Sequence, residues 1–292
     1  MRVYCRRISE YAIKSMLYEV AASPKPGLVD RENPGAHDDM DIFTFMDSIA
    51  VLSGYYYDCA KEGLDFEGED YTRLMENLRP LGIEAEKDMF RATEGVNTHK
   101  GMIFSLGILA AAAASIYKET HEEKIHNKDL AKRVQEMTQG ICQELEDCLD
   151  KPEEDLTYGE YLYKNHNMKG IRGEAESGFE TVTDFALATF KKQLEEKRGQ
   201  VNEVLVQTLL ILMAETEDSY VLGRHDIDTL YYVQEKSKKA LDLGGIFTRE
   251  GLDYIEEMDK DFIEKNISSG GAVDLLSVTL MFYLIEEGDI RI

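Results

Sequence analysis

The chain has no tryptophan, only five prolines and no excess of positive charge. Its 33 lysines and arginines face 57 acidic residues, which gives a net charge of −24. Nucleic acids and anionic membranes require a cationic surface, so neither is expected as a partner. Small polyanionic ligands are not excluded, because a few local cations, helix N-termini and a divalent metal ion can hold them.

Cysteine is also scarce, and the four cysteines form no Cys-x-x-Cys pair or cluster with histidine at metal-ligand spacing. Cys5, Cys59, Cys142 and Cys148 are therefore predicted to be reduced thiols, typical of a cytoplasmic protein. The basic N-terminus is not followed by an apolar segment, so we expect no signal peptide. The longest apolar run, residues 102–117, is short for a membrane span and predicts a buried core helix.

Apolar side chains recur with a helical period along most of the chain, whereas the alternation typical of strands is nearly absent. The pattern predicts an all-α fold, with helices at 9–23, 40–62, 74–93, 102–117, 127–150, 180–197, 202–218, 226–242, 249–264 and 272–286. A short helical stretch and a glycine-punctuated loop are expected between 150 and 180. No repeat or long linker divides the chain, so we predict a single multi-helix bundle domain over residues 1–292.

The stretch SPKPGLVDRENPGAHDDMD, residues 23–41, breaks this rhythm with prolines, glycines and many polar side chains. Asp38, Asp39 and Asp41 crowd the start of the next helix, where the helix dipole favours carboxylates. Capping of that helix is one explanation. Because so many like charges repel one another without a cation, a Mg²⁺ site is the other.

A second polar stretch, GVNTHKG at residues 95–101, precedes the apolar run. Thr98 is expected to cap the helix, with His99 and Lys100 in its first turn. Cationic side chains there oppose the helix dipole, and a bound anion would offset that cost. The alternative is a turn glycine with a surface lysine. The order of residues is not that of a Walker A loop.

Two further polar stretches lie near helix ends. In GIRGEAESGF, Arg172 with Glu174 and Glu176 forms either a plain ion pair or a phosphate-binding and metal-binding group. The other is a pair of segments, residues 217–226 and 266–276, in which two adjacent glycines offer backbone N–H groups before a helix.

With these stretches in view, the chain resembles the triphosphoribosyl-dephospho-CoA synthase family, which makes the precursor of the citrate lyase prosthetic group and has relatives serving malonate decarboxylase. The matching words are EVAASPKPGLVDRENPGAHDDMD, EAEKDMFRATEGVNTHKGMIFSLGIL, GIRGEAESGF, LLILMAETEDSYVLGR and NISSGGAVDLL, in the family's order from Glu19 to Leu276. The resemblance implies an all-helical enzyme that forms 2′-(5″-triphosphoribosyl)-3′-dephospho-CoA from ATP and 3′-dephospho-CoA and releases adenine. Its expected partners are these substrates and the downstream holo-acyl-carrier-protein synthase pathway, and a homodimer is left open.

This glycosyl transfer needs a general base, protonation of the leaving base and a cofactor Mg²⁺ with the triphosphate. We assign substrate binding to polar and glycine residues of the four stretches: Lys25, Asn33, Asn97, Thr98, His99, Lys100, Arg172, Arg224, Gly270 and Gly271. Mg²⁺ is assigned to Asp39, Asp41 and Glu176. His37 or Asp30 is the expected base, and Glu174 is expected to stabilise the cationic ribose or protonate adenine.

The C-terminal third departs from the family pattern at Tyr220, at His225-Asp226 and at Ser269, which leaves room for two other hypotheses. One is an HD-type metal-dependent nucleotide phosphohydrolase that uses His37-Asp38 and His225-Asp226. The other is a degenerate protein that binds a nucleotide or CoA without turnover.

Overall fold

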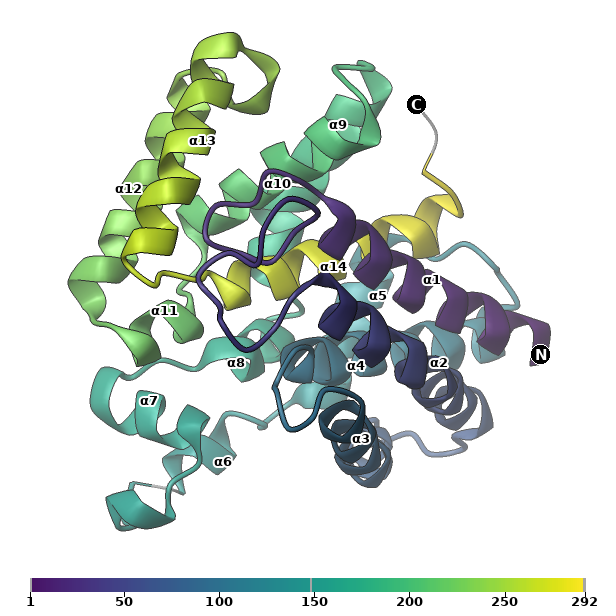
Figure 1. The fold of residues 1–292 in the computed structure, drawn as a ribbon. Coiled ribbons are helices and arrows are strands. Elements are labelled where there is room, and N and C mark those ends of the chain that lie inside the picture. Colours follow the sequence, from purple (N-terminus) through teal and green to yellow (C-terminus); the bar gives the residue numbers. More distant parts are fainter. Residues whose placement is uncertain (1, 148, 291–292) are drawn as a thin grey trace.

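The computed structural model describes residues 2–147 and 149–290, so the predicted thiol Cys148 lies outside the described residues. Within these two ranges the regular elements are all helices, which confirms the all-α prediction (Figure 1). Cys5, Cys59 and Cys142 are buried free thiols, as predicted.

The helices are α1 (Arg2–Ala21), α2 (Ile42–Asp65), α3 (Thr72–Ala92), α4 (Lys100–Thr120), α5 (Asn127–Thr138), α6 (Gln143–Glu146), α7 (Tyr158–His166), α8 (Gly170–Glu176), α9 (Leu187–Glu195), α10 (Val201–Glu215), α11 (Ser219–Arg224), α12 (Ile227–Asp242), α13 (Arg249–Glu264) and α14 (Gly270–Glu287). Short 3₁₀ turns lie at Glu153–Asp155 and Gly245–Phe247, and a π-helical segment, Val182–Ala186, leads into α9.

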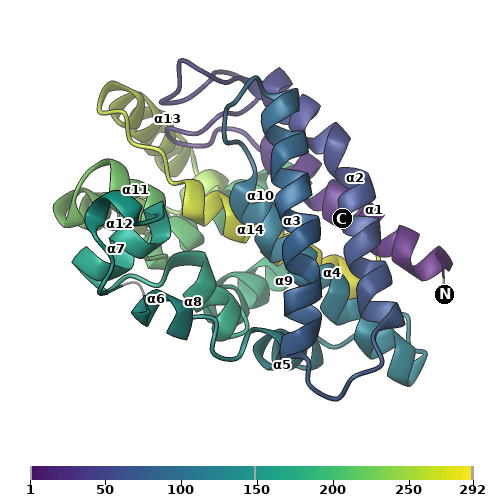
Figure 2. The ribbon, with the colours of Figure 1, turned by 90° about the horizontal axis from the view of Figure 1, so that it is seen from below.

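Helices α4 and α14 form the centre of the molecule because they are apolar on nearly every side. By length and composition α4 could cross a membrane, but 83% of its apolar window is buried inside the protein. It is therefore the predicted core helix. Figure 2 shows α14 running between α1–α3 on one side and α11–α13 on the other. One hydrophobic core extends from Tyr4 in α1 to Ile285 in α14.

Several predicted helix boundaries were wrong. The predicted helix 127–150 ends at Thr138, because Gly140 adopts the left-handed region at φ 81° and the chain turns into the short α6. The predicted loop after residue 169 contains α8. The predicted helix 202–218 ends at Glu215, and Asp218 caps the separate helix α11.

Candidate active site

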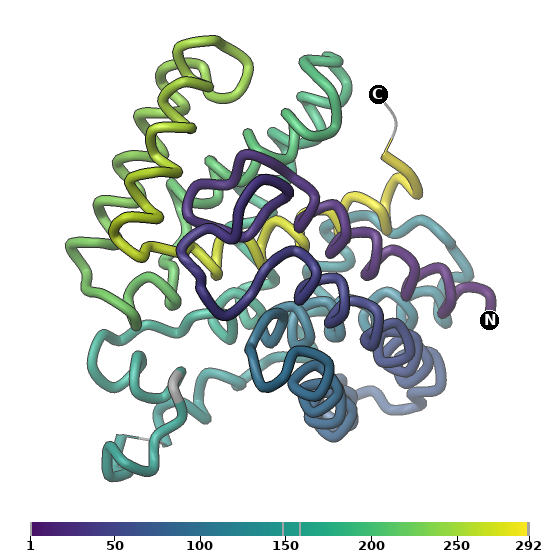
Figure 3. Tube along the Cα trace, in the orientation of Figure 1, coloured from purple at the N-terminus to yellow at the C-terminus, as the bar shows by residue number. Residues whose placement is uncertain are grey.

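The segment between α1 and α2, residues 22–41, folds back over the start of α14 and lies beside α13 (Figure 1; Figure 3). The backbone N–H of Gly27 donates to Asp259 Oδ1 at 2.9 Å, and Asn33 Nδ2 donates to Asp259 Oδ2 at 3.1 Å. Gly27 has a φ of 71°, and a side chain there would overlap the carbonyl oxygen of Ile267. Asn33, predicted to bind substrate, thus helps to hold this loop in place.

Asp30 organises the same loop from inside. Its Oδ2 accepts from Ser23 Oγ at 2.8 Å and from the Lys25 N–H at 3.0 Å, and its Oδ1 accepts from the N–H groups of Glu32 and Asn33. The side chain is only 3% exposed. Both oxygens are thus occupied, so a role for Asp30 as general base would require breaking these bonds. That role stays a prediction.

Lys25 and Glu19 form an ion pair in which both side chains are buried. The ammonium group also donates to the Glu19 carbonyl oxygen at 3.0 Å. Burial raises the pKa of the Glu19 carboxyl, and the charge of Lys25 opposes that rise. Among the described residues Glu19 Oε2 has no hydrogen-bond partner. The charge of Lys25, predicted to clamp phosphate, is therefore already paired inside the protein.

The GVNTHKG stretch begins α4 differently from the prediction. Helix α4 starts at Lys100, with His99 in the N-cap position. The Lys100 N–H is bound by Asn97 Oδ1 at 3.2 Å, whereas the Thr98 hydroxyl donates to Ser48 Oγ at 2.8 Å. The predictions that Thr98 caps the helix and that His99 lies in its first turn were therefore wrong, because Asn97 supplies the acceptor.

The His99 ring is completely buried, with Nδ1 2.7 Å from Ser48 Oγ and Phe45 edge-on at 4.9 Å between ring centroids. Burial, together with the charge of Lys25, lowers the pKa of His99 to about 3. The ring is therefore neutral at physiological pH, contrary to the predicted cationic role. Since Ser48 accepts from Thr98, its own proton is assigned to Nδ1, which leaves the ring proton on Nε2. Within the described ranges Nε2 has no partner.

Lys100 has a different environment from His99. Its side chain is 53% exposed, and its ammonium group lies 3.0 Å from Glu86 Oε2 on α3. The contact is a surface ion pair, which contributes little stability and is easily exchanged for another anion. Lys100 thus remains available at the start of α4.

The start of α14 meets the start of α11 through one buried carboxylate. Asp218 accepts from the N–H groups of Tyr220 at 2.9 Å, Val221 at 3.2 Å and Ala272 at 2.9 Å. Burial raises the pKa of the Asp218 carboxyl, and these N–H groups oppose the rise. At the start of α14, the Ala272 N–H is thus already bound by Asp218, which leaves fewer of the N–H groups that the sequence predicted would bind an anion.

Gly270 and Gly271 permit this close approach. A Cβ at Gly270 would lie 2.9 Å from the Tyr220 ring, and one at Gly271 would lie 3.0 Å from the Asp218 carboxyl carbon. Beside them, Ser269 is fully buried and its Oγ has no hydrogen-bond partner in the described part of the chain. The absence of side chains at these two glycines therefore allows α14 to pack against α11 and its cap, in addition to any role in binding a ligand.

Asp274, one turn into α14, was not among the predicted site residues. It is 5% exposed, and a methyl group added to Gly101 of the GVNTHKG stretch would overlap its Oδ2. Burial, with the nearby charges of Glu19 and Asp218, raises its pKa well above the usual range. The only sequence signal was an acid just after the two glycines, which does not reveal that α14 and α4 touch there.

These residues form a buried polar group that we call the buried centre: Glu19, Lys25, His99, Asp218, Ser269 and Asp274. It gathers the end of α1, the loop after it, and the starts of α4, α11 and α14. Three of the four predicted stretches thus contribute to one place.

His37 and Arg224 lie at the edge of this region. His37 Nε2 is 2.9 Å from Ser268 Oγ, and its Nδ1 is 3.8 Å from Asp39 Oδ1. Burial and the charge of Arg224 lower the pKa of His37, while Asp39 and Asp38 oppose that shift. A neutral imidazole of this kind suits the predicted role of general base.

The predicted metal ligands do not form a preformed cage. Asp41 caps α2, with Oδ1 accepting from the N–H groups of Phe43 at 2.9 Å and Thr44 at 3.0 Å, and these bonds lower its pKa. Over residues 2–147 and 149–290, no three His, Cys, Asp or Glu side chains are arranged to hold a metal ion. Mg²⁺ bound through substrate phosphates needs only one or two carboxylates, and the 54% exposed Asp39 fits that requirement.

Helix α8 contacts other parts of the chain. Arg172 lies 3.7 Å from Glu144, and Glu176 Oε1 accepts from the N–H groups of Gly140 at 3.0 Å and Cys142 at 3.4 Å. The structure therefore ties Arg172 to α6 and Glu176 to the turn after α5, and not to the buried centre. Their predicted phosphate and metal roles gain nothing from this placement.

Glu174 is the remaining acid of α8. Its Oε1 accepts from Thr181 Oγ1 at 2.5 Å, and its Oε2 is buried without a hydrogen-bond partner among the residues described. Burial raises the pKa of the Glu174 carboxyl. Glu174 therefore has the character of a proton donor, and its predicted role stays a prediction.

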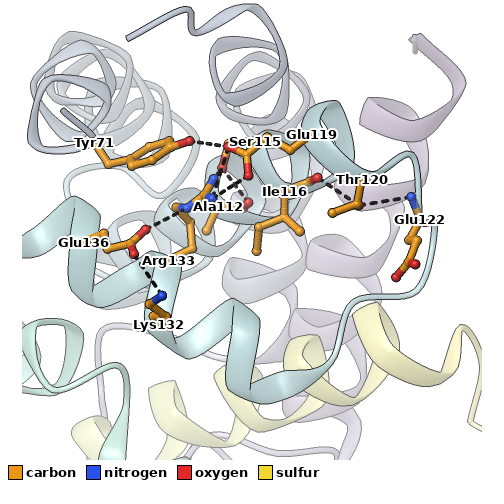
Figure 4. Close-up of polar contacts among 10 residues, drawn as sticks. All are labelled: Tyr71, Ala112, Ser115, Ile116, Glu119, Thr120, Glu122, Lys132, Arg133 and Glu136. Atoms are coloured by element: carbon orange, nitrogen blue, oxygen red, sulfur yellow. Dashed lines mark hydrogen bonds and ion pairs between the residues drawn. The ribbon is translucent and has the colours of Figure 1, made fainter. Parts of the chain in front are cut away.

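The prominent surface hollows lie elsewhere. One, of about 290 Å³, is formed where α4 ends and α5 begins (Figure 4). There Arg133 donates to Ser115 Oγ at 2.6 Å, pairs with Glu119 and Glu136, and stacks on Tyr71. Another hollow, of about 510 Å³, lies between α12 and α13. Neither contains a predicted site residue, so the buried unpartnered polar atoms locate the candidate site better than hollow size does.

The second His-Asp pair of the phosphohydrolase hypothesis has structural partners. His225 Nε2 is 3.0 Å from the Asn266 carbonyl oxygen, and Asp226 caps α12 by accepting from the Thr229 N–H at 2.8 Å. The geometry gives no support to a metal site there.

A family model described as ATP:dephospho-CoA triphosphoribosyl transferase (CitG) matches residues 5–291. The chain is therefore an all-helical transferase. The chain belongs to the CitG family, and its activity is that of a triphosphoribosyl-dephospho-CoA synthase.

Curated relatives agree over nearly their whole length. A probable 2-(5''-triphosphoribosyl)-3'-dephosphocoenzyme-A synthase of Lactiplantibacillus plantarum is 39% identical, covering 95% of this chain and 96% of the relative. One of the same name from Streptococcus mutans is 39% identical, with 96% of each chain covered. One from Malonomonas rubra is 37% identical, covering 94% and 86%. No solved structure matches the chain. These relatives support the transferase and neither alternative hypothesis.

Proposed function

We propose that this chain transfers the triphosphoribosyl group of ATP to the 2′-hydroxyl of 3′-dephospho-CoA at the buried centre, with release of adenine. The observation that carries the location is a set of buried polar atoms without partners among the described residues: Glu19 Oε2, His99 Nε2 and Ser269 Oγ. Buried polar atoms are nearly always hydrogen-bonded, so their grouping indicates places for ligand atoms.

The triphosphate belongs at the rim of the centre, where positive charge is exposed or movable. Lys100 at the start of α4 can leave Glu86 for a phosphate, and its helix start has N–H groups that favour an anion. Arg224, close enough to His37 to shift its pKa, is the second cation. Mg²⁺ enters with ATP and neutralises phosphate charge, and Asp39 is the carboxylate best placed to share it.

The acceptor hydroxyl requires a base, and His37 is the group we propose. Its imidazole is kept neutral by burial and by Arg224, so it can accept a proton at physiological pH. The bond between Nε2 and Ser268, together with Asp39 near Nδ1, fixes the orientation of the ring. Removal of the hydroxyl proton makes the oxygen a better nucleophile toward C1 of the ribose.

The proposal extends to the cellular location of the protein, the use of its product and its oligomeric state. The three buried free thiols support a cytoplasmic location. The product would pass to a holo-acyl-carrier-protein synthase pathway serving citrate lyase or malonate decarboxylase. A homodimer is a further proposal, tested by the mass of the protein in solution.

The purified protein should be incubated with ATP, MgCl₂ and 3′-dephospho-CoA, and adenine measured by chromatography. We expect adenine only when both substrates are present. Coenzyme A, which carries a 3′-phosphate beside the 2′-hydroxyl, is the matched control acceptor and should react much more slowly. Phosphate release without adenine would reject the proposal in favour of a hydrolase, and ligand binding without any product would favour a protein without turnover.

A further inference from the structure

The buried centre holds three carboxyl groups, and their surroundings differ. Asp218 accepts three backbone N–H bonds, and Glu19 is paired with Lys25. Asp274 is only 5% exposed, and among the described residues no hydrogen bond opposes the rise that burial causes in its pKa. A buried carboxylate with no opposing cation or hydrogen bond is the costliest of the three to ionise, so Asp274 is the one that most favours the protonated form.

The position of Asp274 also places it against the substrate-binding stretch. Its Oδ2 occupies the space that a side chain at Gly101 would fill, so the carboxyl lies against the first turn of α4. His99, whose Nε2 has no partner in the described ranges, precedes that turn by one residue. A protonated carboxyl and a neutral imidazole N–H are therefore presented from two helix starts.

The neutral part of ATP suits this environment better than the triphosphate does. Adenine offers ring nitrogens that accept hydrogen bonds and an exocyclic amino group that donates them. His99 Nε2–H provides a donor, and Glu19 Oε2 provides an acceptor without a partner among the described residues. Burial of a flat neutral base also avoids the desolvation cost of buried phosphates.

We propose that Asp274 is the general acid of the transfer, donating its proton to a ring nitrogen of adenine as the bond between C1 and N9 breaks. The electron pair of that bond goes to N9, and the new bond joins C1 to the acceptor oxygen. The proton of the acceptor hydroxyl goes to the general base and then to solvent, which reprotonates Asp274 before the next turnover. This inference rests on the proposed function.

Burial and the neighbouring acids Glu19 and Asp218 raise the pKa of Asp274 and so favour its protonated form. Activity should therefore fall as pH rises through this elevated pKa, because the acid form is lost. Glu174, the acid predicted from sequence, differs in that its Oε1 is already bound by Thr181. Variants of Asp274 and Glu174 can therefore be distinguished by the pH dependence of their adenine release.

The test compares Asp274→Asn, Glu174→Gln and the exposed control Asp58→Asn by adenine release across a range of pH, with ATP affinity and helical content measured in parallel. Asparagine resembles a protonated carboxyl in shape, so Asp274→Asn should fold and bind ATP within about threefold of wild type. We expect its kcat to fall by about 100-fold or more and its alkaline pH limb to disappear. Asp58→Asn should match wild type.

A kcat within threefold of wild type for Asp274→Asn would overturn the inference. So would an alkaline limb that persists in Asp274→Asn and vanishes in Glu174→Gln. If Asp274→Asn fails to fold, Gly101→Ala displaces the carboxyl by steric overlap, and an unchanged kcat in that variant overturns the inference equally. Wild-type protein that releases no adenine would instead reject the proposed function.

Discussion

Replacement of Lys25 by methionine should reveal how much stability the buried ion pair with Glu19 provides. Both side chains are almost wholly inaccessible, so the change leaves a carboxylate without its counter-ion in the interior. Breaking such a pair costs about 3–5 kcal/mol. For a chain of this length that corresponds to a decrease in Tm of about 5–8 °C.

The stability loss of Lys25→Met should depend on pH. Burial raises the folded-state pKa of Glu19, and loss of Lys25 removes the interaction that opposes the rise. Folding of Lys25→Met then requires proton uptake by Glu19. The loss of stability relative to wild type is therefore largest at neutral pH. The loss of stability shrinks as pH falls through the unfolded-state pKa of glutamate, because below that pKa both the folded and the unfolded state carry the proton.

Thermal unfolding followed by circular dichroism at neutral and acidic pH measures both effects, and the exposed Lys124→Met is the control, expected within about 0.5 kcal/mol of wild type. Adding Glu19→Gln to Lys25→Met should recover part of the loss, since no charge is then buried. A loss below about 1 kcal/mol, together with abolished ATP binding, would refute the structural role and restore Lys25 as a phosphate clamp.

Three further outcomes follow from the site. Lys100→Ala should raise the KM for ATP by about tenfold without changing helical content, because a charge-assisted phosphate contact is lost; unchanged kinetics would contradict it. Asp39→Asn should raise the MgCl₂ concentration giving half-maximal activity by about tenfold, with recovery at excess MgCl₂, and an unaltered Mg²⁺ titration would remove Asp39 from the metal site. In wild type, kcat should fall at acidic pH only below the usual histidine range, because the pKa of His37 is lowered, and His37→Gln should lack this limb.

The helical fold could be predicted because periodicity is a local property. The apolar run that became α4 needed no knowledge of its neighbours to be recognised as a core helix. The break after Thr138 was missed because the apolar pattern continues through Gly140, whose left-handed conformation ends the helix.

The candidate site was only partly predictable. Motifs indicated the GVNTHKG stretch and the loop before α2, but not that His99 is neutral or that Lys25 is paired, since both depend on burial by distant segments. Glu19 lies in the last turn of α1 and Asp274 lies one turn into α14, where each resembles an ordinary helix residue. Their importance arises only when the fold brings them together.

The most direct test follows the two ends of ATP separately. ATP labelled in the adenine ring and ATP labelled in the γ-phosphate should each be incubated with the protein, MgCl₂ and 3′-dephospho-CoA. We expect adenine label in the free base and phosphate label in the CoA-derived product, in equal amounts. Phosphate label in inorganic phosphate, with adenine label retained in ADP or AMP, would contradict it.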